Sequence, residues 1–115
     1  MNAEELVKGI RSTIINDNLE IYRDLYESTQ VENATDEYWN EALKFYSKLS
    51  PDDRDMLFRI MRQVSVDTVS NFFAILDGVS HFDGQDDDLF LAPESELENR
   101  LNGGLQDIFL EIEEG

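Results

Sequence analysis

His81 is the only histidine in the chain and the residue best suited to acid–base chemistry near neutral pH. Asp77 and Asp83 flank it in the sequence, so a carboxylate could orient its ring for a role as general base. A nucleophile is missing from this pattern, because the serines and threonines fall at predicted caps and helix positions and no Gly-x-Ser-x-Gly turn occurs. The sequence therefore favours an ordinary loop histidine, and we do not expect an enzyme.

The acidic stretch that follows His81 has part of the ligand spacing of a calcium-binding EF-hand loop. The first, third, fifth and twelfth positions of a twelve-residue window are occupied by Asp83, Gln85, Asp87 and Glu94. However, Asp88 stands where the sharp turn needs glycine, and Pro93 stands where the next helix should already be established. A weak calcium site held by charge alone stays open, but a solvated acidic loop is the favoured interpretation.

Sites for phosphate, cofactors and nucleic acid are not indicated. The glycine pair at residues 103–104 lacks a following lysine and is better explained as a helix stop. A group of arginines alternates with Asp52, Asp53 and Asp55, which favours intrahelical ion pairs over a basic patch: Arg54, Arg59 and Arg62. We therefore expect no cofactor and no direct binding of nucleic acid.

Net charge is the strongest signal in the chain, and it is unevenly placed. The formal charge is −17, and residues 63–115 hold thirteen acidic residues against one cation, Arg100. Residues 1–62 hold thirteen acids and eight cations, so the two parts carry about −5 and −12. Such a field repels nucleic acid and anionic membranes and attracts basic partners. The charge therefore favours a basic protein as the partner.

Length and composition indicate one soluble domain over residues 1–115. The 115 residues are 41% hydrophobic, which is enough apolar content to build one core. Cysteine is absent, no apolar run is long enough to span a membrane, and the N-terminus lacks the features of a secretory signal. We expect a cytoplasmic protein that does not associate with membranes.

Helical periodicity runs through the first half of the chain. A first helix is predicted from Leu6, Val7, Ile10 and Ile14, and the polar run 16–18 (Asn-Asp-Asn) favours a turn or cap after it. The next stripe fits either a second helix or a bent continuation of the first: Leu19, Tyr22, Leu25 and Tyr26. Residues 30–33 are expected to form a loop, and Thr35 is expected to cap a helix that buries Trp39, Leu43, Tyr46 and Leu49.

The second half should contain a long central helix. Ser50 and Pro51 form a strong helix start, and Gly78 offers a left-handed stop. A break of this helix near Ser65 is left open. We expect its buried stripe to consist of Leu57, Met61, Val64, Thr68, Phe72, Ile75 and Val79, flanked by Ile60, Val69, Phe73 and Leu76.

The segment after Gly78 gives weaker signals. Residues 80–88 are expected to form a loop, residues 89–92 a short extended segment and residues 93–101 a brief helix. Residues 105–113 fit either a helix or a strand. Together these patterns predict a mainly α protein, a single compact helical domain of five to six helices.

Aromatic residues amid carboxylates are the best candidates for a binding surface. Trp39 and Tyr46 fall on the predicted buried stripe, so core packing is favoured for most of the rings, whereas Tyr38 is displaced toward solvent. Exposed aromatic anchors rimmed by one sign of charge are typical of high-affinity interfaces. The predicted partner-binding residues are therefore Glu37, Tyr38, Glu41, Asp83, Asp86, Asp87 and Asp88.

In its size, acidity, helical content and tyrosines amid carboxylates, the chain resembles bacterial immunity proteins, which bind and neutralise a toxin that is often a basic nuclease. The adjacent tyrosine pair of the colicin-type members has no counterpart, because the tyrosines here are never neighbours. The resemblance implies a non-catalytic inhibitor that sequesters a basic toxin or nucleic-acid enzyme. The alternative is a small regulatory or structural subunit that self-associates through Phe72, Phe73 or the segment around Phe109.

Overall fold

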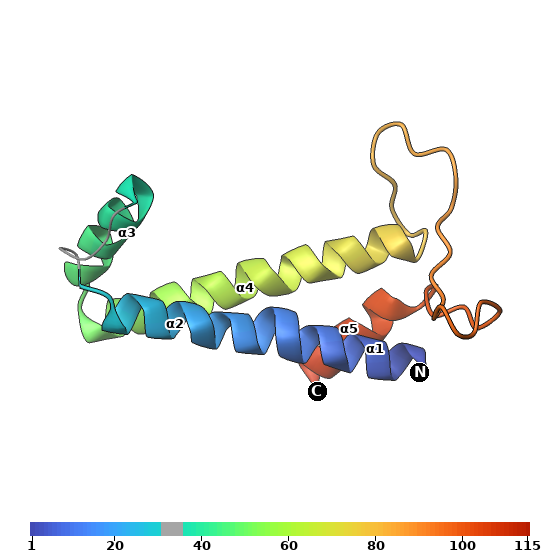
Figure 1. The fold of residues 1–115 in the computed structure, drawn as a ribbon, viewed down its shortest axis with the longest axis horizontal. Helices are drawn as coiled ribbons and strands as arrows, with labels where there is room; N and C mark the ends of the chain where they lie inside the picture. Colours follow the sequence, from blue (N-terminus) through green and yellow to red (C-terminus); the bar gives the residue numbers. More distant parts are fainter. Residues whose placement is uncertain (31–35) are drawn as a thin grey trace.

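The computed structural model describes residues 1–30 and 36–115 of the chain (Figure 1). The N-terminal part is one continuous helical rod, made of α1 (Ala3–Ile10), the π-helix η1 (Arg11–Asp17) and α2 (Asn18–Ser28). We call these three segments the N-terminal rod. It is followed by α3 (Glu37–Ser47), α4 (Pro51–Leu76) and α5 (Leu105–Glu114).

The mainly α class is confirmed, because no strand is assigned in the described residues. The same residues form four separate helical bodies, fewer than the five to six predicted. The chain stays helical at residues 16–18, so of the two predicted alternatives the continuation of the first helix is the one that occurs, whereas residues 93–101 form turns instead of the predicted helix. Residues 89–92 have no regular secondary structure, and residues 105–113, which fitted either a helix or a strand, are helical.

The π-helix explains why the first helix buries a different residue from the one predicted. Hydrogen bonds in a π-helix join residues five apart, so each of its turns holds more residues than an α-helical turn. The face that begins at Val7 consequently reaches Ile15, which is fully buried, instead of Ile14, which is about half exposed. The residues at 16–18 remain helical within the same rod.

The starts of α3 and α4 are fixed by side-chain caps. The Asp36 carboxylate accepts a hydrogen bond from the Tyr38 backbone N–H at 2.8 Å, so Asp36 is the cap and the prediction of Thr35 is wrong by one residue. Thr35 and most of the loop predicted at residues 30–33 lie outside the described residues. The Ser50 hydroxyl accepts from the Asp53 N–H at 3.1 Å, which confirms the start predicted at Pro51.

Helix α4 is the longest element and organises the rest. Its 26 residues extend about 39 Å at 1.5 Å per residue, and they continue without a break at Ser65. The Ser65 hydroxyl donates to the Met61 carbonyl one turn back, so it is accommodated inside the helix. Gly78 follows with φ of 78°, the left-handed conformation expected of a helix stop.

The core lies where α5 packs between the N-terminal rod and α4. Phe73 of α4 and Phe109 of α5 are fully buried and meet edge to face, with 5.6 Å between ring centroids. The other buried members of this cluster come from all three bodies: Val7, Ile15, Val66, Val69 and Leu105.

A second, aromatic cluster fixes α3 at the other end of the molecule. Tyr26 of α2 lies 5.4 Å from Trp39 and 5.1 Å from Tyr46, both of α3, and 6.3 Å from Phe58 of α4, measured between ring centroids. Leu43 and Tyr46 are buried, as their positions on the predicted α3 stripe indicated.

Residues 77–104 form a long loop that is tied to the end of α4 by side chains. The buried Asn102 amide donates to the carbonyls of Leu76 and Leu89, and its oxygen accepts from the Leu91 N–H. The Asp77 carboxylate accepts from the backbone N–H groups of Gly103 and Gln106 and so caps the start of α5. These bonds hold both ends of the loop without secondary structure.

The molecule is elongated, with extents of 53 × 34 × 26 Å. Its radius of gyration is 18.1 Å, whereas a spherical domain of this length would have a value of about 13 Å. None of the helices in residues 1–30 and 36–115 is long and apolar enough to cross a membrane.

Candidate functional site

Helix α4 has two apolar faces, and only one of them is covered. The covered face packs on the N-terminal rod and α5 and contains Phe58, Val66, Val69 and Phe73. The opposite face is exposed to solvent and contains Ile60, Val64, Thr68 and Phe72; we call these four residues the open face. Ile60 is 53% exposed, and Val64 and Phe72 are each 59% exposed.

The open face corrects the predicted core of α4. The stripe expected to be buried ran through Val64, Thr68 and Phe72, which are the exposed residues, while Val69 and Phe73, expected on the flank, are buried. Both stripes have helical spacing, so periodicity alone cannot decide which one meets the rest of the protein. A helix that is apolar on opposite sides is normally covered on both, and here one side has no neighbour among the described residues.

At one end, the open face continues into a groove between α3 and α4. The groove has a volume of about 450 Å³ and is lined by Tyr26, Tyr38, Glu41, Ala42, Phe45, Leu57 and Met61. Tyr38 is 67% exposed, as predicted, and Phe45 is also exposed. Burial raises the pKa of the Tyr26 hydroxyl, and the neighbouring Tyr38 and Tyr22 raise it further. The groove is therefore mainly apolar, with the Glu41 carboxylate at its edge.

At the other end of α4, residues 79–88 follow the helix. Val79 and Phe82 are exposed apolar residues, and they are followed by the acidic run at Asp83, Asp86, Asp87 and Asp88. In Figure 1, α3 and this loop both leave α4 on the side away from the N-terminal rod. The groove, the open face and residues 79–88 thus follow one another along α4, and we call them together the cradle: α4 is its floor, and α3 and the loop, at its two ends, are its walls.

The structure divides the predicted binding residues between the two walls. Glu37, Tyr38 and Glu41 lie on α3, whereas the four aspartates lie on the loop at the far end of α4 (Figure 1). All seven are exposed, and the open face lies between the two groups. Sequence reasoning missed the floor, although the signal was present as a second apolar stripe on the long helix.

The uneven charge along the sequence is also uneven in space. Residues 77–115 contain twelve acids and one cation, Arg100, and they lie away from α3, around the loop and α5 (Figure 1). The end of the molecule that carries α3 holds Arg23, Lys44, Lys48 and Arg54, so its charge is closer to balance. The loop wall is consequently the more strongly negative of the two.

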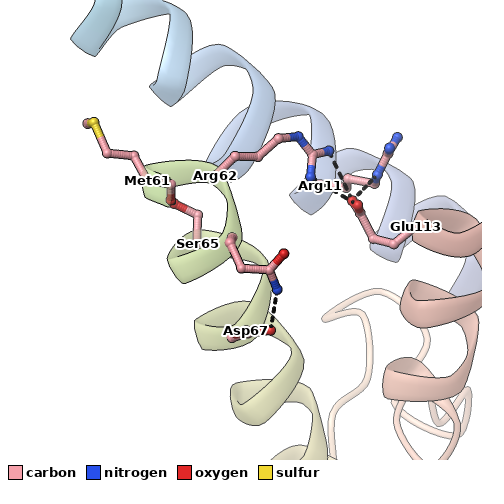
Figure 2. A network of polar contacts seen from close by, with 7 residues as sticks. Arg11, Met61, Arg62, Ser65, Asp67 and Glu113 are labelled. Carbon is pink, nitrogen blue, oxygen red and sulfur yellow. Dashed lines mark hydrogen bonds and ion pairs between the residues drawn. The ribbon is translucent and has the colours of Figure 1, made fainter. Parts of the chain in front are cut away.

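Behind the cradle, a charged clamp holds α5 against the two long helices (Figure 2). The Glu113 carboxylate accepts hydrogen bonds from Arg62 of α4 at 3.0 and 3.2 Å and from Nε of Arg11 in the rod at 2.6 Å. Burial of Glu113 acts to raise its pKa, but the hydrogen bonds and charges of Arg62 and Arg11 outweigh it, so the pKa is lowered. Figure 2 also shows Met61 extending away from Glu113, toward the other side of α4.

The arginines of α4 do not form the intrahelical ion pairs that the sequence suggested. Arg62 bonds to Glu113, and Arg54 donates to the carbonyls of Tyr46 and Ser47. Arg59 makes no ion pair with residues 1–30 or 36–115; it lines a pocket of about 410 Å³ between α2 and α4 together with Arg23 and Arg62. Arg23 there lies 4.3 Å above the Phe58 ring and 3.8 Å from Asp55. Arg59 and Arg62 therefore point toward the rod, Arg54 contacts the end of α3, and none of the three lies on the open face.

His81 and the acidic residues near it do not have the arrangement that their spacing in the sequence suggested. His81 Nε2 lies 3.1 Å from Asp88 Oδ1, while Asp77 is engaged in capping α5. The Gln85 side chain bonds to the Phe82 N–H and the Asp87 carbonyl, so its polar atoms are engaged within the segment that has part of the EF-hand spacing. Among residues 1–30 and 36–115, no three His, Cys, Asp or Glu side chains are arranged to hold a metal ion.

Comparison with protein-family models, with curated proteins and with solved structures found no match to this chain.

Proposed function

We propose that this protein is an acidic binding module that sequesters a basic protein partner, such as a toxin or an enzyme acting on nucleic acid, in the cradle. The observation that carries this proposal is the uncovered apolar face of α4, which runs between two walls that carry carboxylates. Stable protein interfaces combine a desolvated apolar centre with a charged rim, and the cradle has these two parts in that arrangement.

The charge supports a basic partner in particular. A net charge of −17 accelerates the approach of a cationic surface, and the aspartates of the loop wall meet that surface where it would otherwise meet phosphate. The apolar floor then determines how long the complex lasts. Inhibition follows from occupation of the partner's basic surface and requires no catalysis, in keeping with the resemblance to immunity proteins.

The proposal is tested by capture with matched variants. The wild-type chain, Val64→Gln and Ile21→Gln are immobilised and exposed to an extract of the source cells, and retained proteins are identified by mass spectrometry. Ile21 is the control because it is 55% exposed on α2 and belongs neither to the open face nor to the lining of the groove. We expect a basic protein that is retained by the wild type and by Ile21→Gln, is largely lost with Val64→Gln, and elutes as salt screens the charges.

Poly-lysine serves as the control for charge alone. It should bind all three forms equally, because it has no apolar surface to place on α4. Retention of basic proteins that is insensitive to Val64 would contradict a role for the open face, and the absence of any salt-sensitive basic partner would contradict sequestration itself. A captured partner should also lose its nucleic-acid binding when the wild-type chain is added.

Self-association is a second candidate, and one observation favours it: Phe72 is exposed and lies on the open face. The other two segments considered for this role are buried, because Phe73 and Phe109 pack on each other in the core. Two chains of −17 repel each other, so a dimer would have to be favoured by apolar contact alone. Sedimentation at low and high salt tests it, because screening should strengthen a dimer and weaken a complex with a basic partner.

A further inference from the structure

We infer that the partner inserts a single amphipathic helix into the cradle, about four turns long, with lysine or arginine near both ends. This inference rests on the proposed function and specifies the element of the partner that is bound. Extended peptides bind by adding a strand to a sheet edge, and residues 1–30 and 36–115 offer no strand to which one could be added. The side chains of an exposed helix face are suited instead to a second helix, whose ridges pack between them.

The floor has the length of a short helix. From Leu57 to Phe72 the chain advances fifteen residues along α4, which is about 23 Å at 1.5 Å per residue. Larger side chains mark both ends of this stretch, with Leu57 and Met61 in the groove and Phe72 near the loop wall. Between them lie the smaller Val64 and Thr68, so a large apolar residue of the partner can pack at the centre, where binding energy is usually concentrated.

The hydroxyl groups of the floor need no partner from outside. The Thr68 hydroxyl donates to the Val64 carbonyl at 2.7 Å, and the Ser65 hydroxyl donates to the Met61 carbonyl at 2.9 Å. An apolar stripe can therefore cover these residues without leaving a buried donor unsatisfied. This property distinguishes the floor from a surface built to bind a polar ligand.

Charge decides between a partner helix and a second copy of this chain. Arg59 and Arg62 line the pocket that faces α2, so they add no positive charge to the floor. Carboxylates stand at both ends of the cradle, with Glu41 on the groove and Asp83, Asp86, Asp87 and Asp88 on the loop. A second copy would bring its own acidic loop close to these groups, whereas a helix with cations near both ends complements them.

The test uses three fluorescent 18-residue peptides. The first has a leucine stripe at i, i+3, i+4 and i+7 spacing with lysines near both ends; the second has the same composition with the stripe scrambled; the third has glutamate in place of lysine. We expect the first to bind the wild-type chain and Ile21→Gln, and to bind Val64→Gln and Phe72→Gln about tenfold or more weakly, because the floor is the centre of the contact. Both altered peptides should bind the wild type similarly weakly, and circular dichroism should show added helix only with the first.

The outcomes separate this inference from the proposed function. Equal binding of the striped and scrambled peptides would overturn the inference of a bound helix, because charge alone would then account for the binding. A captured basic protein whose retention depends on Val64, but which the striped peptide does not displace, would also contradict the bound helix. The proposed sequestration of a basic partner would then still hold. Tight binding of the striped peptide by a chain that captures no basic protein would support the helical groove and contradict sequestration. A stable dimer that the striped peptide does not dissociate would assign the cradle to a second copy and overturn the inference.

Discussion

Val64 and Phe73 lie on opposite faces of α4, nine residues and about 180° apart, and both faces are apolar. Phe73 is fully buried against Phe109, whereas Val64 is 59% exposed. The helix thus contributes to folding with one side, and under the proposed function its other side binds the partner. This division predicts that stability and binding can be changed separately by substitutions in the same helix.

The first prediction concerns stability and uses two neighbouring phenylalanines. Phe73→Ala should lower the free energy of unfolding by about 3–5 kcal/mol, because it removes a buried ring and leaves a cavity. Phe72→Ala should change it by about 0.5 kcal/mol or less, because its ring contributes little to the core. Urea unfolding followed by circular dichroism measures both. Equal losses would show that the open face is covered within the folded chain.

The second prediction separates the two parts of the cradle by kinetics. Replacement of Asp86, Asp87 and Asp88 by asparagine should slow association with the basic partner and flatten its dependence on salt, because these groups act during approach. Val64→Gln should instead accelerate dissociation and leave association nearly unchanged, because the floor makes contact only in the complex. Surface plasmon resonance at several salt concentrations measures both rates. A triple variant that affects only dissociation would contradict a steering role for the loop.

The sequence was sufficient for the mainly α class and for features that depend on local chemistry. The Ser50 cap, the stop at Gly78 and the exposure of Tyr38 each follow from residues close by in the chain, and all three are confirmed. Local chemistry was less reliable in residues 93–101, of which only Leu101 is buried and which form turns instead of a helix. Propensity without packing is too weak to hold a helix of that length.

Features that depend on packing could not be predicted. Ile14 and Ile15 are equally apolar, and only the wide turns of the π-helix bring Ile15 to the core. The choice between the two stripes of α4 depends on where the rod and α5 pack, and that placement is fixed by long-range contacts such as Arg62 with Glu113. The walls of the candidate site were therefore found from exposed residue types, while its floor required the structure.

The third prediction concerns the clamp and its pH dependence. Glu113 has a lowered pKa in the folded protein, so its contribution to stability is present above its ordinary pKa of 4.5 and is lost as the pH falls through the folded value. Glu113→Gln should lower the free energy of unfolding by about 1–3 kcal/mol at pH 7, because two arginines lose a charged acceptor. The difference between wild type and variant should shrink toward pH 3.

Unfolding curves at pH 7, 5 and 3 measure this difference. Glu111→Gln is the matched control, because Glu111 is an exposed carboxylate on the same helix and makes no ion pair with the described residues. Its stability should follow that of the wild type at each pH. A Glu113→Gln deficit that is constant from pH 7 to pH 3 would show that packing, and not charge, gives the clamp its strength.

The fourth prediction links the buried Asn102 to the acidic wall of the cradle. Its side chain bonds to backbone groups of Leu76, Leu89 and Leu91, so Asn102→Ala would leave partly buried groups without partners. The expected loss is about 2 kcal/mol or more, together with faster proteolysis within residues 79–101, because the loop is no longer held to the end of α4.

Asn99→Ala is the control for this prediction, because Asn99 lies in the same loop and its bonds, to the Met1 carbonyl and the Glu96 carboxylate, are exposed. It should resemble the wild type in both measurements. If the loop must be held for its aspartates to face the partner, Asn102→Ala should also slow association under conditions where the protein remains folded, without altering any residue that touches the partner. Normal association by a variant whose loop is rapidly cleaved would show that the loop wall acts through its charge alone, and that its position on α4 does not matter.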